Sequence, residues 1–150
     1  MKVVIQRVLE SSVKVDGKTV GEIGKGMMVL CGFVENDTDE DLDWCAHKVC
    51  ALRIFDDEAG VMNRPVVETD GGILAISQFT LMASTKKGNR PSYIAAARPE
   101  VSIPLYEKFL KLLEAYLGKP VQHGIFGADM KVTLVNDGPV TIVIDTKNRE

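Results

Sequence analysis

The sequence predicts an α/β fold, a mixed β-sheet or part-barrel with two main helices on one side. Apolar residues alternate or run continuously in the first and last thirds of the chain, which is typical of strands, and two segments place them at helical spacing. A length of 150 residues with 45% hydrophobic and 26% charged residues suits one compact domain. No composition break, low-complexity tract or internal repeat divides the chain, so residues 1–150 are expected to form a single domain.

Strands and a tight hairpin are predicted for the N-terminal segment. The first strand covers residues 3–9, and residues 12–15 then alternate with residues 18–20 across Asp16 and Gly17. An Asp-Gly pair between two alternating runs favours a type I′ turn, because both central positions of that turn need a positive φ. We therefore expect a β-hairpin around this pair.

A buried strand and a helix follow the hairpin. The run Met27–Val34 is apolar at almost every position, so this strand is expected to be covered on both faces. Residues 36–41 supply capping oxygens and carboxylates, and apolar residues recur at helical spacing directly after them, at Leu42, Cys45, Ala46 and Val49. This pattern predicts a helix over Asp39–Ala51.

The middle of the chain contains a strand whose character changes along its length. After a short strand at Arg53–Phe55 and a turn at Asp56–Gly60, the run Ile73–Leu81 begins apolar and becomes polar at Ser77-Gln78-Phe79-Thr80. Polar side chains at the end of a buried strand often face a cleft, and this stretch supplies hydroxyls, an amide and an aromatic ring. A strand that simply reaches the surface explains the pattern equally well. Residues 84–92 are expected to form a loop.

The second helix is the clearest element of the sequence. Apolar residues follow one helical face from Leu105 to Leu117. Ser102 is the expected N-cap, Pro104 falls in the first turn, and Gly118 ends the helix.

The last segment is predicted to form two strands, over residues 132–135 and 140–144, joined by the link Asn136–Pro139. Glycine before proline eases the steric restriction on the preceding residue, and a tight link between strands is where cis proline tends to occur. Because only about 5–6% of X-Pro bonds in folded proteins are cis, these residues alone leave both isomers open.

Charge and cysteine content restrict the class of protein. A net charge of −3 and a pI near 5.5 give no sign of the broad basic face expected of a non-specific nucleic-acid binder. Three cysteines without paired spacing suit a reducing compartment. The longest apolar run is about eight residues, too short to span a membrane, and no signal peptide is recognisable. We therefore expect a cytoplasmic protein with no membrane and no DNA partner.

Candidate metal ligands do not converge. On the predicted helix, Cys45 and His47 point about 200° apart and Cys45 and Cys50 about 140° apart, so the three side chains cannot share one ion. The acidic residues at 37–43 suit the start of a helix, where the helix dipole favours negative charge. We therefore expect no metal.

Conventional catalytic and phosphate-binding motifs are missing as well. The sequence has no G-x-S-x-G elbow and no glycine-rich phosphate loop, and we expect no cofactor. With only two histidines, one arrangement stays open as an alternative, a dyad of His123 with Ser77 or Thr80.

Several motifs of the sequence occur together in one known family. In order, they are Gln6-Arg7-Val8, Gly21–Gly24, Ser77–Leu81, Gly88–Tyr93, Phe126–Met130 and Asn136–Thr141. On these residues the chain resembles the D-aminoacyl-tRNA deacylases, historically called D-tyrosyl-tRNA deacylases, over nearly all of its 150 residues. Tyr93 stands where the family commonly has phenylalanine, and Asn89 occupies a variable position.

The resemblance implies a homodimer whose active sites lie at the subunit interface. The reaction would be hydrolysis of the ester between a D-amino acid and the 3′-terminal adenosine of tRNA, in the service of chiral proofreading during translation. Glycyl-tRNA mischarged on tRNA-Ala would be a further substrate. The pair Gly138-Pro139 would be cis and would enter the partner's pocket, where its backbone excludes an L side chain. Arg7 would support this Gly-Pro loop.

The resemblance also implies roles for the remaining motif residues. Thr80, Ser77 and Gln78 would be catalytic, the latter two by orienting the substrate through hydrogen bonds. Phe79, Phe126 and Met130 would contact the terminal nucleoside or its ester. Two mechanisms stay open: Thr80 as nucleophile, for which no base is evident, or backbone N–H groups that stabilise the oxyanion while the ribose 2′-hydroxyl assists water.

Other interpretations remain beside this one. Lys86, Lys87 and Arg90 could contact phosphates, although a solvated loop is the simpler interpretation. The protein could also be a non-catalytic dimeric module that binds RNA ends, or a general hydrolase of small esters. Release of the amino acid from matched D- and L-aminoacyl-tRNA distinguishes these classes.

Overall fold

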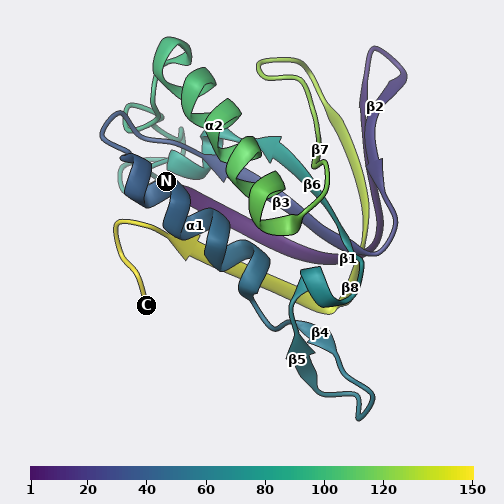
Figure 1. Cartoon of the computed structure of the whole chain (residues 1–150). Helices are drawn as coiled ribbons and strands as arrows, with labels where there is room; N and C mark the ends of the chain where they lie inside the picture. The colour runs from purple at the N-terminus through teal and green to yellow at the C-terminus, as the bar shows by residue number, and fades with distance from the viewer.

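A long N-terminal strand organises the architecture, which is a strongly curved sheet with two helices packed on one face (Figure 1). The computed structural model describes residues 1–150. Its strands are β1 (Lys2–Val15), β2 (Lys18–Ile23), β3 (Gly26–Gly32), β4 (Phe55–Asp56), β5 (Met62–Arg64), β6 (Gly72–Ser77), β7 (Gln122–His123) and β8 (Lys131–Asp145). Its helices are α1 (Asp39–Ala51) and α2 (Pro99–Leu117), with short 3₁₀ turns η1 (Val66–Glu68) and η2 (Phe79–Met82).

The main sheet has six strands of mixed direction. The order is β2-β1-β3-β6-β7, with β8 along the other edge of β1, and β3, β6 and β7 run parallel to one another. β2 also approaches β7, where the Glu22 N–H donates to Gln122 Oε1 at 3.5 Å, so the sheet curls toward closure. The prediction of a mixed sheet or part-barrel with two helices on one side is confirmed.

β1 is one continuous strand where the sequence predicted two. Its first half pairs with β3, its second half pairs with β2, and β8 pairs with both halves. A register shift against β8 between Val8 and Glu10 marks a bulge, which turns Val8 and Val13 toward the same side of the sheet. The predicted hairpin is confirmed, because Asp16 and Gly17 have φ of 50° and 76° and join paired strands.

Two apolar clusters lie on opposite faces of the sheet. The larger, of 23 buried residues, joins the helices to one face and includes Phe109, Leu113 and Val29. The smaller, which includes Met28 and Leu74, fills the concave side under the curled strands. β3 contributes to both clusters, so the expectation that this strand is covered on both faces is confirmed.

The start of α1 agrees with the prediction and the start of α2 does not. α1 begins after Thr38, whose side chain and the Asp41 side chain cap each other's backbone N–H groups. α2 begins at Pro99, so Ser102 lies inside the helix and donates to the Arg98 carbonyl at 3.1 Å, and Pro104 is interior. A proline at the first position starts the helix without a side-chain cap, which explains the error. The helix ends at Gly118 (φ 81°) as predicted.

The strand predicted to reach Leu81 ends at Ser77, and the residues after Gln78 form η2 instead. The Gln78 N–H donates to the Cys31 carbonyl at 2.7 Å, which is the last contact that β3 offers. Beyond it the chain bonds to itself, from the Leu81 N–H to the Gln78 carbonyl at 3.2 Å. Gly32 permits this turn, since a Cβ there would lie 2.9 Å from the Gln78 oxygen.

β8 is also continuous where the sequence predicted two strands joined by a link. Both halves pair with the same edge of β1, but four residues, 137–140, lie opposite the single residue Arg7. These four residues, which we call the Gly-Pro bulge, include a cis peptide bond between Gly138 and Pro139. Three smaller differences concern short strands: β4 covers Phe55–Asp56 and not residues 53–55, and β5 and β7 were not predicted.

Membrane-spanning helices and the Cys45, His47 and Cys50 side chains were both considered from the sequence, and the structure bears on each. None of the helices is long and apolar enough to cross a membrane. Cys45 and Cys50 are buried in the core, whereas His47 is exposed and packs on Tyr116 with ring centroids 5.1 Å apart. The structure therefore does not bring these three side chains together.

Candidate active site

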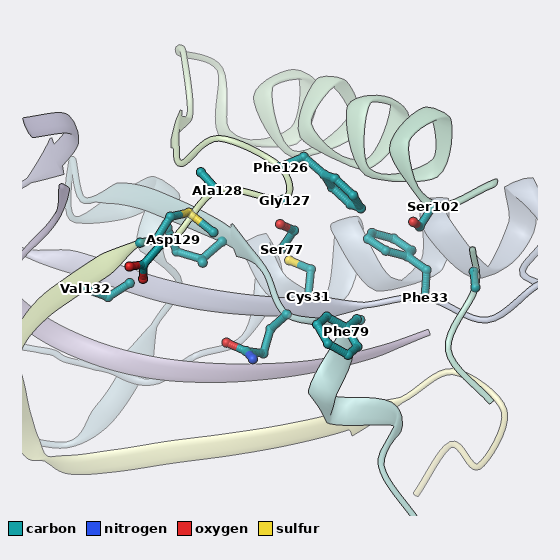
Figure 2. A pocket seen from close by; sticks show the side chains of 15 residues that line it. Cys31, Phe33, Ser77, Phe79, Ser102, Phe126, Gly127, Ala128, Asp129 and Val132 are labelled. Atoms are coloured by element: carbon teal, nitrogen blue, oxygen red, sulfur yellow. The ribbon is translucent and has the colours of Figure 1, made fainter. Parts of the chain in front are cut away.

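A cavity of about 300 Å³ opens beyond the carboxyl ends of the parallel strands β3 and β6 (Figure 2). The carboxyl ends of parallel strands are a common place for ligands, because the strands stop there and loops must complete the wall. The loop before β8 and the first turns of α2 close the other sides. Nine of the 15 lining residues are hydrophobic, so the cavity is an apolar pocket with a few polar groups.

Two polar residues of the cavity, Ser77 and Gln78, come from the end of β6. Ser77 is the last residue of that strand and pairs with Cys31 of β3, and in Figure 2 it lies between Phe126 and Phe79. Gln78 also lines the cavity, and its side-chain amide donates to the Thr80 hydroxyl. The polar end of the strand therefore faces a cleft, which is one of the two interpretations that the sequence left open.

An exposed aromatic pair forms one rim of the cavity. The Phe79 side chain lines the cavity although 56% of it is exposed to solvent. Tyr93 packs edge-to-face against it, with ring centroids 5.1 Å apart and an interplanar angle of 73°. An exposed aromatic face beside a cavity is a stacking surface for a planar ligand.

The opposite wall comes from the loop before β8. Phe126 rests on Tyr106 with ring centroids 6.0 Å apart. Met130 covers Gly124, where a Cβ would lie 2.3 Å from the Met130 sulfur. Glycine at this position therefore lets Met130 lie against the chain and leaves the cavity open. Asp129, which sequence reasoning did not single out although it lies within the Phe126–Met130 motif, also lines the cavity and pairs with Lys131 at 2.9 Å.

Cys31 in the cavity wall and Tyr106 behind Phe126 both have raised pKa values, and both are kept neutral. Burial, together with the neighbouring Cys45 thiol, raises the pKa of the Cys31 thiol well above its ordinary value. Burial also raises the pKa of Tyr106, whose hydroxyl donates to the Ala75 carbonyl at 2.9 Å. Neither group supplies a thiolate or phenolate nucleophile at neutral pH.

Thr80 and His123 do not form a dyad at this cavity. Thr80 lies in η2, two residues after Gln78, and neither Thr80 nor His123 lines the cavity wall. His123 pairs with Ala75, and its Nδ1 donates to the Gly124 carbonyl at 2.7 Å. The alternative of His123 acting as base for Ser77 or Thr80 is therefore not realised in the structure.

Arg7 holds the Gly-Pro bulge at a separate place in the molecule. Its side chain is buried, with Nε donating to the Asp137 carbonyl at 3.1 Å and Nη1 donating to the Ile54 carbonyl at 2.7 Å. The carboxylates of Asp56 and Asp137 each lie 3.6 Å from the guanidinium group. Arg7, Asp56 and Asp137 line a second hollow of about 320 Å³. A planar guanidinium between two carbonyls and two carboxylates fixes the base of the bulge.

The two motif groups do not meet within one chain. Through strand pairing, Ser77 lies beside Cys31, and Cys31 lies beside Val3 of β1. The Gly-Pro bulge lies opposite Arg7, four residues farther along β1, a displacement of about 13 Å along the strand in addition to the two strands between. Gly138 and Pro139 are accordingly absent from the wall of the cavity.

The cavity also contains residues that sequence reasoning missed. They include Cys31, Phe33 and Ala97, together with Ser102, which was interpreted as a helix cap. The surrounding sequence of each residue is typical of a buried core or of the start of a helix. These residues line one cavity only because β3, α2 and the loop before β8 meet in the folded chain.

Comparison with known proteins places the chain in a family. A sequence model described as D-Tyr-tRNA(Tyr) deacylase matches residues 4–145. Proteins named D-aminoacyl-tRNA deacylase from Bacteroides fragilis and Dechloromonas aromatica are 65% and 60% identical, over 100% and 98% of both chains respectively.

Solved structures show the same fold. A structure titled "c-Myc DNA Unwinding Element Binding Protein" is 39% identical with a TM-score of 0.91, covering 97% of this chain and 98% of the other. A probable eukaryotic D-amino acid tRNA deacylase, 21% identical, has a TM-score of 0.81 and covers 95% and 97%. The chain therefore belongs to the D-Tyr-tRNA(Tyr) deacylase family and is a hydrolase that acts on an ester bond.

Proposed function

We propose that this protein hydrolyses the ester that joins a D-amino acid to the 3′-terminal adenosine of tRNA, and that it thereby proofreads chirality in translation. The observation that supports this most is the cavity itself, an apolar pocket with an aromatic rim and the polar pair Ser77 and Gln78. A space of about 300 Å³ suits one terminal nucleoside with its ester and is far too small for a duplex. The family to which the chain belongs favours the same substrate.

The terminal adenosine would be held by its base and by its ribose. The exposed face of Phe79 offers a stacking surface for the adenine, because every base has a planar π-face. Ser77 and the Gln78 amide would donate or accept hydrogen bonds at the ribose and the ester. Phe126 and Met130 would close the apolar side.

Hydrolysis would proceed without a side-chain nucleophile. The Thr80 hydroxyl accepts from the Gln78 amide, which is not a base, so Thr80 has no group that could take its proton. Instead, backbone N–H groups near Phe79 and Thr80 would stabilise the oxyanion while the ribose 2′-hydroxyl orients water. Water adds to the ester carbon, the bond to the ribose 3′-oxygen breaks, and a proton from the attacking water passes to that oxygen. The products are free D-amino acid and tRNA.

The complete site would need two copies of the chain. The Gly-Pro bulge lies too far along the sheet to reach the cavity of its own chain. In a two-fold homodimer, the bulge of one protomer would enter the cavity of the other. There the backbone of Gly138 and Pro139 would hold the substrate's α-amino group and occupy the space that an L side chain requires. Glycine, which has no side chain, would be admitted, so glycyl-tRNA mischarged on tRNA-Ala would also be hydrolysed.

Amino-acid release tests the reaction directly. The protein is incubated with D- and L-forms of the same aminoacyl-tRNA, and the free amino acid is followed. We expect release from the D-form only. Equal rates with both enantiomers would contradict the chiral filter, and binding of tRNA without release would indicate a module that only binds RNA ends. Hydrolysis of simple esters at the same efficiency as tRNA esters would indicate a general esterase.

Subunit mixing tests the composite site. Gly138→Leu should make the bulge obstruct the partner's cavity, and Phe79→Ala should impair the cavity of its own chain. Each variant alone should therefore be nearly inactive. When both chains are denatured and refolded together, each mixed dimer would contain one site with an intact cavity and an intact bulge. Random pairing should then restore about one quarter of wild-type activity. No restoration would show that each site is contained in one chain.

A further inference from the structure

We propose that the loop between Ser84 and Ser92 is a phosphate-binding surface that grips the backbone of the single-stranded RNA end whose last nucleoside occupies the cavity. We call this segment the basic loop. The proposal rests on the proposed function and extends it, because it assigns the part of the substrate beyond the reacting nucleoside to particular side chains. Its cations are Lys86, Lys87 and Arg90.

The basic loop is a defined projection. Ser84 and Ser92 pair at its base through two backbone hydrogen bonds of 2.8 and 2.9 Å. Gly88, with a φ of 66°, lies at its turn, and every residue from Ser84 to Ser92 is exposed. The three cations are therefore presented together on a short two-armed segment.

The charge of the basic loop is not neutralised by the rest of the protein. No aspartate or glutamate occurs between Asp70 and Glu100, and none of the three loop cations forms an ion pair. The basic side chains that do form ion pairs are Arg7, Arg64, Arg98, Lys108, Lys119, Lys131, Lys147 and Arg149. In a chain with a net charge of −3, three free cations within five residues make a local positive site.

Both ends of the basic loop connect to residues at the cavity rim. Ser92 is followed by Tyr93, whose ring packs on Phe79 at the cavity. Ser84 follows η2, which begins at Phe79. Lys86 is two residues from the base of the loop, within about 7 Å of chain. A nucleoside stacked on Phe79 would therefore place its own 5′ phosphate beside these cations.

Aromatic stacking beside free cations is the pattern that binds single strands. Proteins that bind single-stranded nucleic acid without sequence preference stack the bases on aromatic rings and contact the phosphates with lysine and arginine. This suits an enzyme that must accept many tRNAs, whose ends share the same backbone. Three cations on one short loop cannot follow both strands of a duplex, so the surface favours an RNA end over duplex DNA.

Charge neutralisation with matched substrates tests the basic loop. The test variant carries Lys86→Gln, Lys87→Gln and Arg90→Gln. The control carries Lys14→Gln, Lys18→Gln and Lys111→Gln, which neutralise three exposed cations without ion pairs elsewhere, so both variants reach the same net charge of −6 from −3. The substrates are D-aminoacyl-tRNA and a D-aminoacyl ester of adenosine, which has no phosphate.

We expect the test variant to raise KM for D-aminoacyl-tRNA at least tenfold with little change in kcat. The salt slope of log(kcat/KM) should become shallower by about 2, as for the loss of three single-strand phosphate contacts. Hydrolysis of the adenosine ester should stay within twofold of wild type, and the control should stay within twofold on both substrates. Equal losses in test and control variants would overturn the proposal, as would a matching loss on the adenosine ester.

Direct binding separates this proposal from the proposed function. If wild type hydrolysed neither substrate, the proposed function would fail, while binding of a labelled short single-stranded RNA would still report on the loop. Weaker RNA binding by the test variant than by the control would support the basic loop, and equal binding would overturn it. A DNA duplex that competes as well as the RNA would overturn the assignment to an RNA end.

Discussion

The α-amino group of Met1 forms an ion pair with the carboxylate of Asp37, and the side chains of both residues are closed to solvent. The same amino group donates to the Thr146 hydroxyl at 2.8 Å, and the Thr146 N–H donates to the Met1 carbonyl at 2.9 Å. The two ends of the chain are therefore tied to each other beside α1 (Figure 1). A buried charge pair of this kind becomes costly when one partner is removed.

Removal of the Asp37 charge should destabilise the fold strongly. Asp37→Asn leaves a buried ammonium group without its counter-ion, and we expect a loss of about 3–5 kcal/mol in the free energy of unfolding. Asp39→Asn is the control, because Asp39 pairs with Lys108 at the surface and should contribute less than about 1 kcal/mol. Urea unfolding measures both variants. Similar small losses would show that the Met1 pair contributes no more than a surface pair.

Asp41 should make the stability of α1 dependent on acid. Burial opposes the charged form, but hydrogen bonds from Lys147 and from the Thr38 backbone and hydroxyl outweigh it and hold the pKa of Asp41 well below its ordinary value. A lowered pKa in the folded state stabilises the protein above the ordinary aspartate pKa of about 4, and this contribution is lost as the pH falls through the folded-state pKa.

Comparison of wild type with Asp41→Asn across the acid range measures this contribution. The difference in the free energy of unfolding should be largest near neutral pH and should shrink below about pH 4. A difference that does not change with pH would mean that the charge of Asp41 is not what stabilises the helix start.

Thr80→Ala should keep most of the hydrolytic activity. The hydroxyl accepts a hydrogen bond from the Gln78 amide and has no base beside it, so its removal should cost less than about tenfold in kcat/KM. Single-turnover hydrolysis of D-aminoacyl-tRNA measures the change. A loss greater than about 10³-fold in a correctly folded variant would identify the hydroxyl as the nucleophile.

Gly21→Ala should disturb the closure of the sheet. A Cβ at Gly21 would lie 2.7 Å from the His123 carbonyl oxygen, so β2 and β7 would have to separate, at a cost of about 1–3 kcal/mol. Gly24→Ala is the matched control, because no atom lies within 4 Å of its added Cβ. Thermal unfolding compares the two, and equal stabilities would show that the close approach of β2 and β7 is not needed.

Boundaries that depend on local chemistry could be predicted from the sequence. The Asp16-Gly17 hairpin, the residues of α1 and the end of α2 at Gly118 all agree with the structure. Each of these signals acts within a few residues, through a positive φ or a capping side chain. The predicted start of α2 was wrong because two local signals competed. The helix begins at Pro99 and not after Ser102.

Tertiary structure decided the features that depend on distant partners. β6 ends at Ser77 because β3 ends beside it, and β8 is one strand because β1 pairs with both of its halves. The contact of Arg7 with Asp137, 130 residues away, and the ion pair of Met1 with Asp37 have no local signature. The net charge of −3 likewise hides the local positive charge of the basic loop.

The sequence by itself determined the class of fold, the hairpin, most of the helix boundaries and the motif residues of the cavity. Only the tertiary structure decided that Ser77, Gln78, Phe79, Phe126 and Met130 share one cavity while Gly138 and Pro139 lie opposite Arg7, outside it. The physical reason is that local conformation follows from neighbouring side chains, whereas a site follows from where separate strands end against each other.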